Sequence, residues 1–209
     1  ALPLSENHRN PQPIADLAAK FLPDGSPPAE CIKRGSRKPE IFIYRLLSDF
    51  FKRVDEYANE NPDQTIAVLC TNPNLRSSAL AELSATNSSA RTVREYISNK
   101  ETPGFNALEI NAIHVLTYQT HKGLEYDAVF MPALNDDFFA KETETKRNQV
   151  MVALTRAATK VTLGADEFPS DNSFVLKIID ENHELVEIVN SMPTTSTENP
   201  EKYDEDIPF

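Results

Sequence analysis

The chain has 209 residues, of which 40% are hydrophobic and 25% charged, with a formal net charge of −11. A chain of this length can bury about 70% of its unfolded surface, which suits one α/β domain. The negative charge argues against a protein that binds nucleic acid through a broad basic face. No run of 18 or more apolar residues occurs, and no signal-peptide layout opens the chain, so we expect a cytoplasmic protein without membrane contact.

The first predicted element is a helix, because Ile14, Leu17 and Phe21 recur at helical spacing. Asn10 is the expected N-cap, with Pro11 as the first helical residue. Further along we expect a strand at 41–44, a helix from 46 to before Pro62, a strand at 65–70, a helix through Leu80 and Leu83, strands at 112–116 and 128–134, a helix at 143–157, a strand at 160–163, a helix at 174–179 and an edge strand at 185–189. Short apolar strands alternating with helices predict an α/β fold with a mostly parallel sheet.

The loop at 117–126 (TYQTHKGLEY) lies between two of these buried strands. A polar loop at a strand end is where open α/β sheets bind ligands. Gly123 allows close approach of the backbone, and Lys122 and Glu125 supply opposite charges beside it. The alternative is an ordinary crossover loop with solvated charges. Cys31 and Cys70 lie in apolar or strand-like contexts and are interpreted as reduced thiols, without a disulfide or metal role.

This loop resembles motif V of UvrD/Rep/PcrA-type superfamily-one helicases, T-x-H-x-x-K-G-L-E-[FY], with Gln119 in place of the usual His. Residues 4–10 (LSENHRN) resemble motif IV, L-x-x-N-Y-R-S, with His8 in place of Tyr. Residues 152–157 (VALTRA) resemble motif VI, preceded by Met151 where an aromatic is usual. Residues 71–76 (TNPNLR) are similar to a DNA-contacting T-N-x-x-S-R segment. The resemblance covers residues 2 to about 165 and implies a second RecA-like domain over 1–190.

The resemblance also implies residue roles. Arg9 and Arg156 would act as arginine fingers on the γ-phosphate of ATP, and Glu125 would meet the ribose hydroxyl. His8 and Gly123 would complete the ATP-binding set, and single-stranded DNA would contact Thr71, Asn72, Gln119 and Thr120. Three alternatives stay open: Arg9 is a cation in a solvated loop, Arg156 is a cation favoured at a helix C-terminus, and Asn72 is a helix cap.

The phosphate-binding motif G-x-x-x-x-G-K-[ST] is absent from the sequence, and none of the five glycines precedes a lysine. ATP with Mg²⁺ would therefore be shared with a first RecA-like domain that carries the Walker A and B motifs, and this chain alone is expected to be inactive. Only about 20 residues separate Ser89 from Leu108. Since UvrD-type helicases carry a large inserted subdomain in this region, we expect a compact variant.

The segment 191–209 is rich in Pro, Ser, Thr and Glu, which predicts an acidic flexible tail. Its end (YDEDIPF) resembles the acidic tip of bacterial single-stranded-DNA-binding protein, which docks onto repair and replication enzymes. The residues expected to bind such partners are Asp204, Asp206, Ile207, Pro208 and Phe209.

These features predict the C-terminal motor half of an ATP-dependent DNA helicase or translocase of bacterial or phage type, nucleoid-associated in the cytoplasm. Two other functions remain open. One is a non-enzymatic RecA-like module that binds repair or replication partners through its face or its tail. The other is a nucleotide-independent α/β binding domain whose motif matches are accidental.

Overall fold

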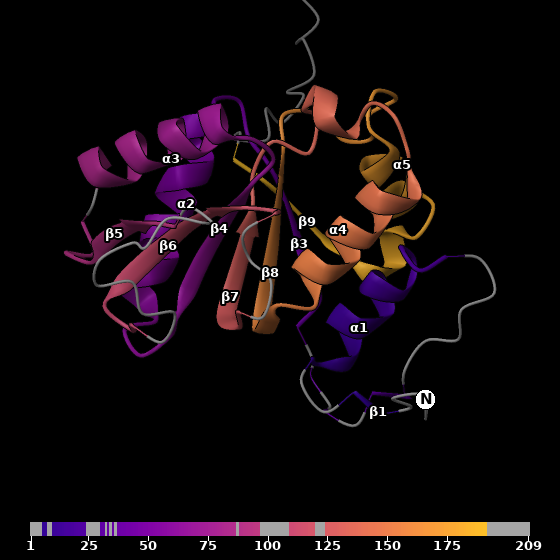
Figure 1. Ribbon diagram of the computed structural model, residues 1–209, viewed down its shortest axis with the longest axis horizontal. Helices are drawn as coiled ribbons and strands as arrows, with labels where there is room; N and C mark the ends of the chain where they lie inside the picture. Colours follow the sequence, from indigo (N-terminus) through magenta and orange to yellow (C-terminus); the bar gives the residue numbers. More distant parts are fainter. Residues whose placement is uncertain are drawn as a thin grey trace, which may run out of the picture.

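The computed structural model describes residues 6–7, 10–23, 30–31, 33, 35, 37–86, 88–96, 109–119 and 124–191. A seven-stranded sheet is covered by helices on both faces (Figure 1). Its strand order is β5-β6-β4-β7-β8-β3-β9, and every neighbouring pair is parallel. The strands are β3 (Glu40–Ile43), β4 (Ile66–Cys70), β5 (Thr92–Glu95), β6 (Ala112–Thr117), β7 (Tyr126–Met131), β8 (Ala157–Ala165) and β9 (Glu187–Asn190). The predicted α/β fold with a mostly parallel sheet is confirmed.

The helices form two layers around this sheet (Figure 1). One face carries α1 (Gln12–Ala19), α4 (Glu144–Leu154) and α5 (Phe174–Asp180), and the other carries α2 (Leu47–Glu60) and α3 (Pro73–Thr86). Successive side chains of β4 point to opposite faces of the sheet, so this strand contributes to the hydrophobic cores on both faces. Ala67 and Leu69 face the first helix layer, while Ile66 and Val68 face the second. Two 3₁₀ turns, η1 (Asp137–Phe139) and η2 (His183–Leu185), and a short parallel pair, β1 (Glu6–Asn7) with β2 (Glu30–Cys31), complete the described elements.

Most predicted elements are confirmed, but several details differ, including these three. Pro11, and not Asn10, is the N-cap of α1, because the Asn10 side chain bonds elsewhere. The helix predicted to reach Ala157 ends at Leu154, since β8 begins at Ala157 to pair with β7. Strand β5 was not predicted: its sequence, TVRE, is polar and only half buried, so it lacks the apolar signal of a buried strand.

All strands of a parallel sheet run in the same direction, so their starts line one side of the sheet and their ends line the opposite side. We call the edge where the strands end the carboxyl edge, and the edge where they begin the amino edge. Residues that directly follow β4, β6 and β7 lie at the carboxyl edge, and residues that directly precede β7 and β8 lie at the amino edge. None of the described helices is long and apolar enough to cross a membrane.

Candidate functional site

The amino edge brings Arg156 and Glu125 into the same neighbourhood. Arg156 is half-buried and lies between the C-cap of α4, Thr155, and the first residue of β8. One terminal nitrogen of its guanidinium donates to the carbonyl of Leu124 at 3.3 Å, and its own carbonyl accepts from the N–H of Tyr126 at 3.0 Å. Glu125, which is exposed, lies between these two partners in the chain. Two of the predicted nucleotide-binding residues therefore share one edge.

A third segment joins this edge through Asn10. Its side-chain amide donates to the carbonyls of Thr155 at 3.0 Å and Ala157 at 2.7 Å, although 145 or more residues separate them in sequence. The side chain is buried, with 2% of the residue surface exposed. The segment that resembles motif IV thus ends against the segment that resembles motif VI. Arg9, His8 and Gly123 lie outside the described residues, so their predicted roles stay predictions.

The carboxyl edge holds Thr71 and Asn72 in a closed hydrogen-bond network. Both side chains donate to the Oδ2 atom of Asp136 at 3.2 Å, and Asn72 also donates to the Thr71 hydroxyl at 3.0 Å. The Asn72 Oδ1 atom accepts from the N–H of Leu75 at 2.9 Å, so Asn72 also caps α3, the alternative raised by its sequence context. Both amide protons of Asn72 are therefore engaged within the domain.

Asp136 is a residue that the sequence prediction missed. Its other oxygen, Oδ1, accepts from the N–H of Phe138 at 2.8 Å and so caps η1. The only sequence signal was an Asn-Asp-Asp run shortly after a buried strand, at the carboxyl edge of the sheet. Asp136 therefore ties the end of β4 to the turn that follows β7.

Aromatic side chains stand beside this network. Gln119 comes after Tyr118, the residue that follows β6, and is exposed. Tyr118 is buried and stacks on Phe138 at 5.9 Å between ring centroids. The ammonium of Lys146 lies 5.0 Å from the centre of the Phe138 ring. Thr120 lies outside the described residues. The carboxyl edge thus combines polar, aromatic and cationic groups around Gln119.

The stretch 117–126 contributes residues to both edges of the sheet. Gln119 lies at the carboxyl edge, after β6, whereas Glu125 lies at the amino edge, before β7. The physical reason is that β6 and β7 are parallel and flank β4, so the chain between them returns to the opposite edge. Those predicted nucleotide-binding and DNA-binding residues that the structure describes are therefore separated by the length of the strands.

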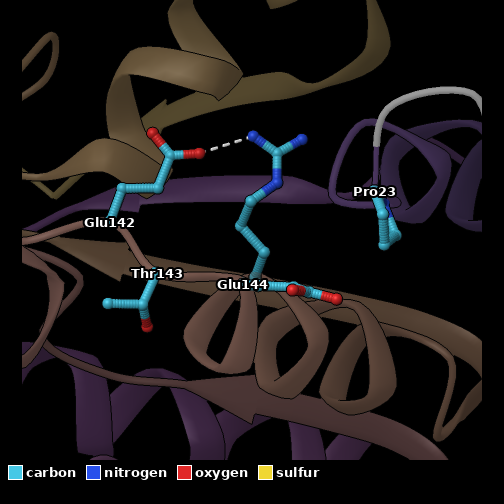
Figure 2. Close-up of a pocket in the computed structure, with 5 residues that line it drawn as sticks. Pro23, Glu142, Thr143 and Glu144 are labelled. Carbon is cyan, nitrogen blue, oxygen red and sulfur yellow. Dashed lines mark hydrogen bonds and ion pairs between the residues drawn. The ribbon is translucent and has the colours of Figure 1, made fainter.

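One described cavity, of about 420 Å³, lies between the end of α1 and the start of α4 (Figure 2). Its lining residues are Pro23, Glu142, Thr143, Glu144 and Arg147. Arg147 pairs with Glu142 at 2.5 Å and donates to the carbonyls of Lys20 and Leu22 at 2.9 and 3.2 Å. These bonds fasten α4 to the end of α1, and no predicted site residue lines the cavity.

The cysteines and acidic residues offer no metal-binding set within the described part of the chain, where no group of three or more His, Cys, Asp or Glu side chains could hold a metal ion. Both cysteines are free. Burial raises the pKa of Cys70 to about 12, so its thiol stays protonated at the end of β4. The predicted tail residues, from Asp204 to Phe209, lie outside the described residues.

The parallel sheet with helices on both faces is a RecA-like fold, similar to that of helicase C-terminal domains. The C-terminal domain of a possible DNA helicase from Lactobacillus plantarum WCFS1 superposes with a TM-score of 0.59 at 21% identity, covering 87% of this chain and 98% of that one. Domain 2 of the DEAD-box helicase Mss116p, solved with an RNA duplex, superposes with a TM-score of 0.52 at 10% identity, covering 76% of this chain and 65% of that one. At these identities the likeness establishes the fold.

A helicase family model matches the central stretch of the sequence. Residues 112–163 match the family model of the UvrD-like helicase C-terminal domain. The match runs from β6 into β8 and includes Gln119, Glu125 and Arg156. The predicted resemblance to UvrD-type second RecA-like domains is confirmed. No curated protein matches the sequence at a significant level.

Proposed function

We propose that this domain is the second motor domain of an ATP-dependent DNA helicase or translocase, with ATP bound at its amino edge against a first RecA-like domain. The observation that carries the proposal is the convergence of three distant segments on this edge, at Asn10, at 124–126 and at 155–157. Each segment belongs to a stretch that resembles a different helicase motif. A binding domain with accidental motif matches would have no reason to bring them together.

The groups at this edge suit the outer part of a nucleotide. A guanidinium presents a rigid fork of donors that fits phosphate oxygens, and Arg156 would hold it against the γ-phosphate as negative charge develops there. Glu125 would accept a hydrogen bond from a ribose hydroxyl. Arg9 would act beside Arg156, and His8 and Gly123 would complete the nucleotide contacts. Mg²⁺ and the β-phosphate would be held by the first domain, because this sequence lacks the phosphate-binding motif G-x-x-x-x-G-K-[ST].

Single-stranded DNA would run along the carboxyl edge in this proposal. Gln119 is exposed and would contact the strand together with Thr120, over a rigid floor formed by Thr71 and Asn72. Their side-chain donors are engaged by Asp136, and the chain carries a net charge of −11, so we expect weak DNA binding by this domain alone. Closure of the interface between the two domains when ATP binds would then change the contacts that the protein makes with the DNA strand.

The test is Arg156→Ala in the complete two-domain protein, with DNA-stimulated ATP hydrolysis as the readout. We expect a loss of about 10³–10⁵-fold in rate, as for other arginine fingers, while nucleotide binding by the first domain persists. Arg156→Lys should restore little of the ATP hydrolysis rate, because an ammonium group lacks the planar fork of donors that a guanidinium has. Lys52→Ala is the control, since this side chain is 60% exposed on α2. An Arg156→Ala protein with the ATPase rate of the control would refute the proposal.

A non-enzymatic interaction module is the second candidate, and its distinguishing feature is the Ile-Pro-Phe run at 207–209 after an acidic stretch. Partners that bind the tip of single-stranded-DNA-binding protein would then bind this chain through Phe209. If this candidate is right, deleting Phe209 should abolish capture of such a partner, and the complete protein should show no DNA-stimulated ATP hydrolysis with or without Phe209. Capture that survives the deletion would exclude the tail as the docking element.

A further inference from the structure

We propose that Asn10 is a positioning residue that fixes the backbone on both sides of Arg156 and so aims the arginine finger. This inference rests on the proposed function of Arg156. The Asn10 amide bonds the carbonyl before Arg156 at 3.0 Å and the carbonyl after it at 2.7 Å. Because one rigid amide group spans both carbonyls, it sets the path of the chain through residue 156.

The two carbonyls need such a partner for different reasons. Thr155 is the C-cap of α4, where helix carbonyls have no partner within the helix. Ala157 begins β8, at the point where the chain leaves the helix and enters the sheet. Arg156 is the single residue at this junction, and Asn10 is buried against it. The Arg156 N–H donates to the carbonyl of Ala153 at 3.2 Å and its carbonyl accepts from the N–H of Tyr126 at 3.0 Å, so Asn10 adds the side-chain bonds to a junction that these backbone bonds also hold.

The chemistry of the side chain explains why asparagine is suited to this position. Its amide carries two protons, so it can donate to both carbonyls at once. The helicase motif that residues 4–10 resemble has serine here, and a serine hydroxyl has one proton to give. Asn10 therefore supplies a two-sided clamp that serine could supply on one side only.

The backbone of Asn10 is held independently of this clamp. The thiol of Cys31 donates to the Asn10 carbonyl at 2.9 Å, and the N–H of Gln12 donates to the carbonyl of Lys33 at 3.0 Å. Helix α1 then packs its apolar face, including Ile14 and Leu17, into the core. A truncated side chain at position 10 should therefore leave the segment in place and remove only the clamp.

The experiment compares Asn10→Ala and Asn10→Ser in the complete two-domain protein. A misplacement of about 1 Å costs on the order of 10²-fold in rate, so we expect Asn10→Ala to lower kcat by roughly 10–100-fold with little change in the KM for ATP. Asn10→Ser should retain an intermediate kcat. The matched control is Asn61→Ala, which removes a similar amide bond, to the carbonyl of Tyr57 at 2.9 Å, in the other helix layer. Thermal melts verify that each variant is folded, and Asn10→Ser carries the test if Asn10→Ala does not fold.

Combining each Asn10 variant with Arg156→Ala separates positioning from general stability. If Asn10 acts through Arg156, its substitution should lower kcat no further once the guanidinium is gone. An effect of equal size in both backgrounds, or a kcat equal to that of Asn61→Ala, would overturn the role of Asn10. If Arg156→Ala itself keeps full activity, the proposed function fails. If Arg156→Ala is inactive while Asn10→Ala is normal, only the Asn10 inference fails.

Discussion

The Asp136 network offers a direct test of how the carboxyl edge is built. Asp136→Ala removes a carboxylate that accepts from Thr71 and Asn72 at 3.2 Å and from the N–H of Phe138 at 2.8 Å. Hydrogen bonds to charged groups contribute about 1.5–3 kcal/mol each when well shielded. Because Asp136 is half-buried and water can replace part of its bonding, we expect a total loss of about 2–4 kcal/mol in the free energy of unfolding. Urea denaturation of the wild-type and variant chains measures this difference.

Asp137→Ala is the matched control, since this neighbouring carboxylate is exposed and its removal should change stability by less than about 0.5 kcal/mol. The loss of stability in Asp136→Asn should fall between the losses in the two alanine variants, because the amide oxygen that remains can still cap η1. A double-mutant cycle with Thr71→Val should give a coupling energy of roughly 0.5–2 kcal/mol. If Asp136→Ala and Asp137→Ala prove equally mild, or the coupling is absent, then the network does not hold this edge together.

Three further predictions concern the core and its titrating groups. Gly164→Ala would place a Cβ atom 2.5 Å from two ring carbons of buried Phe50, so we expect a loss of about 1–3 kcal/mol in urea denaturation, most of it regained on a Phe50→Leu background. Burial raises the pKa of Glu40, but hydrogen bonds from Lys160 and Arg53 outweigh burial and hold this pKa below its ordinary value of 4.5. Glu40→Gln should therefore lower the free energy of unfolding by about 3 kcal/mol at neutral pH, and the difference from the wild type should shrink as the pH falls below 4.5. A difference that does not depend on pH would contradict this assignment. Burial lowers the pKa of His114, so the unfolded chain binds a proton at this residue before the folded chain does as the pH falls below 6.5, and the free energy of unfolding decreases there. His114→Leu should reduce this decrease, and a variant with the pH dependence of the wild type would contradict the prediction.

The sequence by itself determined the elements and the chemistry-bearing residues. Short continuous apolar runs located most strands, and helical spacing of apolar residues located most helices, because burial selects these patterns in any fold that contains them. The stretches around Gln119, Glu125 and Arg156 identified the helicase resemblance through residue types at fixed spacing. Strand β5 escaped detection because its polar residues carry no burial signal.

Only the tertiary structure decided which of these residues meet. Strand order is set by long-range pairing, so the sequence could not show that Glu125 joins Arg156 at the amino edge while Gln119 faces the opposite edge. Local spacing likewise predicted Asn10 as a helix cap, whereas packing directs its amide to carbonyls 145 and 147 residues away. A side chain satisfies whichever unpaired backbone group the fold brings within reach, and that choice depends on distances between segments that no local pattern records.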